Sequence, residues 1–128
     1  MKKKTETWFS MAQSDLDFAR DIVQKGERHF YAVQFCHQAI EKILKAIIQE
    51  KTEEIPKHTH NFKTLCQQAD LEVPEHIQQF LARLAPHYIA SRYPEDMKNL
   101  AKQYHHDYVR ALLKETEEVF SWFKQKLS

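Results

Sequence analysis

The feature that most limits the fold of this chain is its glycine content, because Gly26 is the single glycine among 128 residues. Tight β-hairpins, phosphate-binding loops and dinucleotide-binding turns need glycine for positive φ angles or for close approach of the backbone. The sequence therefore disfavours a β-rich fold, a P-loop and a dinucleotide-binding fingerprint.

Apolar residues recur at three- and four-residue steps along the chain, which is the spacing of amphipathic helices. They predict three long helices, over about 7–25, 28–50 and 105–127, and two short ones, one ending at Ala69 and one starting at Pro74. Gly26 is expected to cap the first helix, and Thr59 or Asn61 to cap the first short one. The expected fold is an all-α, up-and-down bundle of about five helices that forms a single domain over 1–128.

The connection before the last helix is expected to be long. Pro86 and Pro94 bracket residues 87–93, and the segment up to about Lys102 has the weakest periodicity in the chain. Proline removes a helical hydrogen bond, so the fourth helix is expected to end near Pro86.

Charge and cysteine content narrow the function classes. The net charge of +1 comes from 19 basic and 18 acidic residues, so binding of nucleic acid would need a local basic patch. No apolar stretch has the length of a signal peptide or a membrane span, and a cytoplasmic location is expected. Cys36 and Cys66 lack CxxC spacing and are expected to be reduced residues of the core.

The second predicted helix carries apolar residues over about half of its circumference, which predicts a central position in the bundle. Its other face is a polar and basic stripe, formed by Tyr31, Gln34, Gln38, Lys42, Lys45 and Gln49. This stripe is either a solvated face or a contact surface for a partner or for phosphate. Lys42 and Lys45 are three residues apart and project together, so they either hold an anionic group or keep the bundle soluble.

His37 lies at the edge of the apolar face, and Glu41 follows four residues later on the same side of the helix. If both are half-buried, Glu41 is expected to favour the imidazolium form of His37. The alternatives are a structural hydrogen bond of a core-edge histidine and a polar binding role.

In the expected connection, Arg92 and Tyr93 offer a guanidinium and an aromatic ring that can clamp a phosphate and stack on a base. Asp96 can instead neutralise Arg92 in a structural pair. The histidine clusters at 58–60 and 105–106 lack the ligand spacing of known metal sites. No metal and no cofactor are expected.

Four motifs carry a family resemblance. They are Trp8-x(3)-Ala12-x(2)-Asp15-Leu16-x(2)-Ala19, the run from His37 to Ala46 (HQAIEKILKA), Lys57-His58-Thr59-His60, and the run from Ser91 to Asp96 (SRYPED). In this order and at these intervals the chain resembles the HEPN domain over nearly its whole length. The resemblance implies a helical bundle that forms a homodimer and is associated with nucleotides or RNA. It also implies a minimal nucleotidyltransferase partner in a toxin–antitoxin-like pair.

The nuclease members of this family carry an Arg followed, after four to six intervening residues, by a His. After Arg92 the eligible positions 97, 98 and 99 hold Met, Lys and Asn, and only three residues separate Arg83 from His87. The chain is therefore not expected to be a self-sufficient enzyme, and no catalytic residue is assigned. The alternatives are a ribonuclease that combines Arg92 with His37 or His106 across a dimer, and a plain protein-interaction bundle.

Overall fold

The computed structural model describes residues 1–90, 99 and 102–128, and over this part of the chain it contains helices and no strand. The helices are α1 (Lys3–Lys25), α2 (His29–Lys51), α3 (Phe62–Gln68), α4 (Glu75–Ala90) and α6 (His106–Gln125). The predicted all-helical fold is confirmed. Nowhere in the described ranges is a helix long and apolar enough to cross a membrane.

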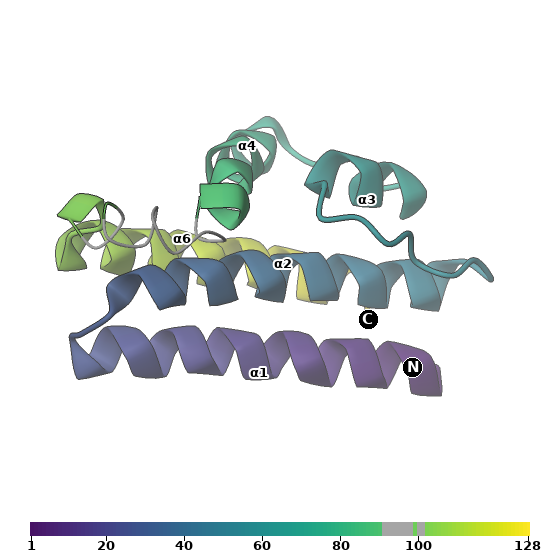
Figure 1. The fold of residues 1–128 in the computed structure, drawn as a ribbon. Coiled ribbons are helices and arrows are strands. Elements are labelled where there is room, and N and C mark those ends of the chain that lie inside the picture. The colour runs from purple at the N-terminus through teal and green to yellow at the C-terminus, as the bar shows by residue number, and fades with distance from the viewer. Residues whose placement is uncertain (91–98, 100–101) are drawn as a thin grey trace.

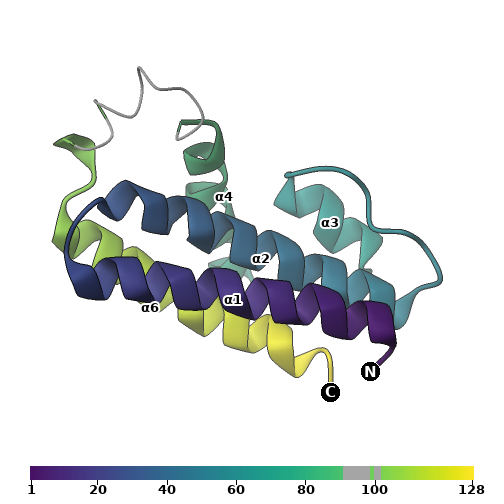
Figure 2. The same ribbon diagram turned by 60° about the horizontal axis from the view of Figure 1, so that its bottom comes forward.

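The three long helices lie side by side, with α1 antiparallel to α2 and α6 running in the direction of α2 (Figures 1 and 2). The two shorter helices, α3 and α4, cover the face of α2 that is turned away from α1, and α4 crosses α2 steeply. The two ends of the chain lie at the same end of the bundle (Figure 1).

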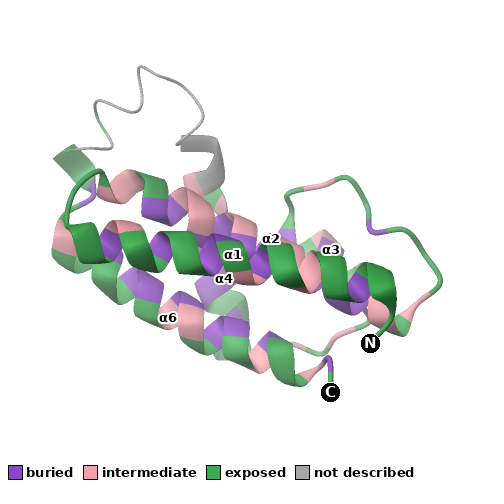
Figure 3. Cartoon of the chain, turned by 90° about the horizontal axis from the view of Figure 1, so that it is seen from below, coloured by how far each residue is buried: buried purple, intermediate pink, exposed green. Residues whose placement is uncertain are grey.

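Helix α2 is the centre of the fold, because α1, α3, α4 and α6 all contact it. The predicted apolar face is confirmed, with nine of its residues buried: Ala32, Val33, Cys36, Ala39, Ile40, Ile43, Leu44, Ile47 and Ile48. By contrast, α1 exposes its outer face and buries one stripe against the other helices (Figure 3). Both cysteines are free and buried, as expected.

Two helix ends follow the sequence prediction. Gly26 takes a left-handed backbone conformation with φ 79°, and its N–H donates to the Ile22 carbonyl at 3.2 Å, which closes α1. The Asn61 side chain accepts a hydrogen bond from the Thr64 N–H at 3.0 Å and so caps α3.

The predicted end of the fourth helix is wrong, because α4 continues through Pro86 to Ala90. The missing N–H of Pro86 would have donated to the carbonyl of Ala82, four residues earlier. Both residues are exposed, so water can satisfy that carbonyl and the cost of the proline is reduced. One consequence is that Arg83 and His87 lie one helical turn apart on α4.

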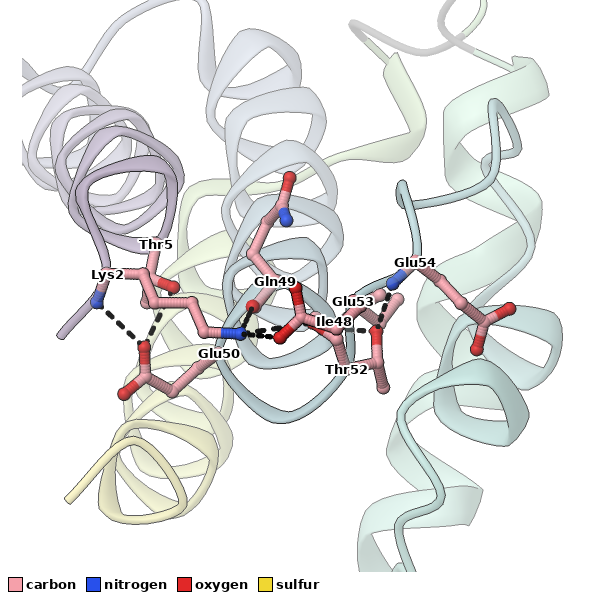
Figure 4. Close-up of polar contacts among 8 residues, drawn as sticks. All are labelled: Lys2, Thr5, Ile48, Gln49, Glu50, Thr52, Glu53 and Glu54. Atoms are coloured by element: carbon pink, nitrogen blue, oxygen red, sulfur yellow. Dashed lines mark hydrogen bonds and ion pairs between the residues drawn. The ribbon is translucent and has the colours of Figure 1, made fainter.

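The N-terminal segment is tied to the end of α2 (Figure 4). The Lys2 ammonium donates to the carbonyls of Gln49 and Thr52, at 3.1 and 3.3 Å, while its backbone N–H donates to the Glu50 carboxylate at 3.0 Å. The Thr5 hydroxyl donates to the same carboxylate at 3.0 Å. These bonds satisfy carbonyls that a helix C-terminus leaves unpaired, and they explain why α1 begins before the predicted position 7.

Candidate functional site

The candidate site is built on one side of α2, where His37, Glu41 and Lys45 follow one another at intervals of four residues and so share a line along the helix. The sequence predicted a polar stripe here, but most of the stripe is not freely solvated. Gln38, Lys42 and Lys45 are all half-buried.

Lys42 forms an ion pair with Asp15 of α1, with 2.7 Å between Nζ and the carboxylate oxygen. The side chains are only 22% and 10% exposed, so the pair is largely withdrawn from water. A carboxylate at this depth requires a partner, and Lys42 supplies it from the neighbouring helix. The charge of Lys42 therefore holds α1 against α2 and is less available to a phosphate.

Glu41 is a second buried carboxylate, with 6% of its side chain exposed. The Nδ1 atom of His60, in the connection between α2 and α3, donates to the Glu41 Oε1 across 2.5 Å. The Lys45 ammonium lies 3.9 Å from the same oxygen and 5.4 Å from the centre of the Trp8 ring. Glu41 thus fixes the orientation of His60, of which 54% of the side chain faces solvent.

His37 is 1% exposed, and its ring stacks on Phe62 of α3 with 4.3 Å between ring centres. Burial, with smaller contributions from the positive charges that His60 and His87 can carry, lowers the pKa of His37 from 6.5 to about 4. His37 is therefore neutral at pH 7. Glu41 was expected to favour its imidazolium form only if both side chains were half-buried, and that condition is not met, because both are buried.

A second polar group lies where α4 meets the start of α6. The two ring nitrogens of His87 face two hydroxyls, Nδ1 that of Tyr104 and Nε2 that of Tyr108, the latter at 3.3 Å. A neutral imidazole has one donor and one acceptor, so two hydroxyls satisfy it fully. Burial lowers the pKa of His87, whereas burial and the neighbouring Tyr108 raise the pKa of Tyr104 to about 12.

One turn before His87, the Arg83 guanidinium binds the Glu115 carboxylate of α6 with two hydrogen bonds, at 2.8 and 3.2 Å. Arg83 and His87 share one side of α4. Arg83 is bound by Glu115 of α6, and His87 is bound by Tyr104 and Tyr108. This arrangement joins the two helices, and it resembles a structural contact more than a nuclease pair.

The remaining predicted site residues are of two kinds. Gln38 lies on α2, one position after His37, and is half-buried. Arg92, Tyr93 and Asp96 lie outside the described residues. The ligand-binding role of all eight candidates stays a prediction.

Sequence reasoning assigned no site role to Asp15, His60 or the two tyrosines beside His87. Asp15 had a usable signal, since it lies in the apolar stripe of α1 between Ala12 and Leu16, where a carboxylate must be paired. His60 lies in the KHTH motif, but its partner Glu41 is 19 residues away, and no local pattern joins them. Among the described residues, no three side chains of His, Cys, Asp or Glu converge as a metal site would require.

Comparisons with known proteins agree with this architecture. A family model described as the HEPN domain matches residues 5–127. The crystal structure of TT1696 from Thermus thermophilus superposes with a TM-score of 0.81 and covers 98% of this chain and 100% of that one, at 22% sequence identity. A likeness at this identity shows a shared fold. The search of curated proteins finds no significant match.

Proposed function

This chain belongs to the HEPN family, and from that premise we propose that it is a nucleotide- or RNA-associated binding module that forms a homodimer in the cytoplasm. Its proposed partner is a minimal nucleotidyltransferase, in a toxin–antitoxin-like pair. The structural observation that supports a binding role is the buried Glu41 carboxylate, which holds the half-exposed ring of His60.

A helix that served only to hold the bundle together could be as stable with well-packed apolar residues in place of the buried Glu41 and its partners. Buried ionisable groups that converge beside an exposed polar side chain are a common property of functional sites. Here the Glu41 contact holds the His60 ring at the surface in one orientation. An oriented aromatic ring of this kind can stack on a nucleobase.

In this proposal His60 stacks on the base, Glu41 positions His60, and Arg92 holds the phosphate. Lys42 and Lys45 support the site indirectly, because both face carboxylates. The proposal therefore expects a larger contribution from His60 and Arg92 than from the two lysines.

The test is isothermal calorimetry of the purified protein with ATP, GTP and a short single-stranded RNA. Loss of one base-stacking contact in His60→Ala should weaken binding roughly five- to hundredfold. His58→Ala is the matched control, since His58 is exposed and lies two residues away in the same connection. Arg92→Ala should weaken binding of all phosphate-bearing ligands.

Four further outcomes separate the alternatives. A well-folded protein that releases no heat with any ligand would be a protein-interaction bundle. Cleavage of total RNA that is lost in Arg92→Ala would identify a ribonuclease with a non-standard site. Sedimentation at the monomer mass would remove the homodimer from the proposal. If the product of an adjacent reading frame does not co-purify with this chain, the nucleotidyltransferase partner is removed as well.

A further inference from the structure

A hollow of the described surface lies between α3 and α4, beside the candidate site. These two helices sit side by side on one face of α2 (Figure 1), and a cavity of about 480 Å³ opens between them. Its inner wall is formed by the buried side chains of Phe62, Cys66 and Leu81. Leu71 and Val73, in the connection between the two helices, line it as well.

The size and lining of this groove suit a small molecule. Known small-molecule pockets occupy roughly 300 to 1,000 Å³ and are mostly apolar, with a few polar groups that orient the ligand. The helix α4 wall carries Ala82 and Ala85 at the groove, and such small side chains leave the space open. Continuous apolar walls of this kind fit an aliphatic chain.

The polar side chains of the groove indicate which head group the aliphatic chain would carry. Lys63 is the only charged side chain among the described lining residues, and within the described chain it forms no ion pair. Gln67 and Gln78 are further polar lining residues, and the Gln78 amide already donates to the Val73 carbonyl at 2.7 Å. With a cation and no described carboxylate in the lining, the groove favours an anionic head group.

We propose that the α3–α4 groove binds a free amphiphilic carboxylate, with the aliphatic chain between Phe62, Leu81 and Ala82 and the carboxylate at Lys63. The groove is half-open and apolar, so affinity comes chiefly from burial of the chain, and Lys63 sets the preference for an anion. The groove adjoins the candidate site, because Phe62 lines it and stacks on His37. None of its described lining residues belongs to the His37–Glu41–His60 group, so ligand binding in the groove can be tested apart from the nucleotide-associated role proposed above.

Decanoate is the first probe, measured by calorimetry with the full chain. Each buried methylene contributes enough that octanoate, two methylenes shorter, should bind roughly tenfold more weakly. Decanol should bind more weakly than decanoate, by about two- to fivefold, because it forms no ion pair with Lys63. Lys63→Gln should remove that preference, whereas Lys114→Gln, a change at an exposed lysine of α6, should not.

A blocking variant tests the place of binding. Ala82→Trp fills the groove from its exposed rim and should abolish decanoate binding, whereas Ala111→Trp, at an exposed position of α6, should leave it intact. Circular dichroism and the thermal midpoint establish that both variants fold.

The inference is overturned if decanoate gives no heat, or if Ala82→Trp binds it as well as the unmodified protein does. Equal affinity for decanoate and decanol would overturn the assignment of Lys63. If the protein cosediments with phosphatidylglycerol vesicles but does not bind decanoate, the groove contacts a membrane surface and the proposal of a free ligand is overturned.

Discussion

Acid should destabilise this protein chiefly through one buried side chain, His37. Its pKa is about 4 in the folded protein, against 6.5 for an ordinary histidine, so the unfolded chain binds the proton more readily. The stability that the neutral ring contributes is fully present above pH 6.5 and is lost as the pH falls from there towards 4. At about 1.36 kcal/mol for each tenfold difference in proton affinity, the total loss is roughly 3 kcal/mol.

The assay is urea unfolding of the unmodified protein and of His37→Phe at several values from about pH 7.5 to about pH 4.5. Phenylalanine retains a ring against Phe62 but cannot take up a proton. Between pH 6.5 and pH 4.5, the unfolded chain binds one more proton than the folded protein. The stability of the unmodified protein should therefore fall more steeply with decreasing pH than that of His37→Phe, by about 1.4 kcal/mol per pH unit. Above pH 6.5, the stabilities of the two proteins should change with pH in parallel.

Carboxylates also titrate below pH 5, and comparison of two otherwise identical proteins cancels most of that effect. His58→Phe serves as the control, because His58 is exposed and its replacement should leave the pH dependence unchanged. If His37→Phe and the unmodified protein lose stability in parallel between pH 6.5 and pH 4.5, His37 does not carry the acid sensitivity and the reasoning is refuted.

Three other outcomes are expected from the same structure. Asp15→Ala should lower the free energy of unfolding in urea by about 2–3 kcal/mol, because it leaves the half-buried Lys42 without its partner. The double change Asp15→Leu, Lys42→Met should recover most of that loss. Gly26→Ala should cost about 1 kcal/mol, through the left-handed backbone alone, since no atom lies within 4 Å of the added Cβ; a thermal midpoint equal to that of the unmodified protein would contradict this. Burial raises the pKa of Cys36 to about 12 and that of Cys66 to about 11, so both thiols should react slowly at pH 8 until the protein is unfolded; rapid labelling of the folded protein would show that the buried core opens.

The helices could be predicted from the sequence because the signals that form them are local. The repeat of apolar residues set the faces of α1, α2 and α6, and Gly26 and Asn61 marked two of the helix ends. The one clear failure, the end of α4 at Pro86, arose because the cost of a proline depends on whether its freed carbonyl meets water. That condition is a property of the folded surface and has no local pattern.

The buried polar group of α2 was predicted only in part. His37 and Glu41 were expected to lie together, since their spacing on one helix places them so. Their protonation and partners were not predictable, because burial of His37 depends on Phe62, and the partner of Glu41 comes from a separate segment, at His60. Electrostatic effects of this kind act across space and change with depth below the surface.

By itself, then, the sequence determined the class of the fold, the central position of α2 and the HEPN family, because periodicity, glycine content and motif order are all properties of the linear chain. The tertiary structure alone decided that Lys42 faces Asp15, that Glu41 holds His60, and that a groove remains between α3 and α4. The physical reason is that charge pairing, burial and cavities arise between segments distant in sequence, and only the packing of the helices brings those segments together.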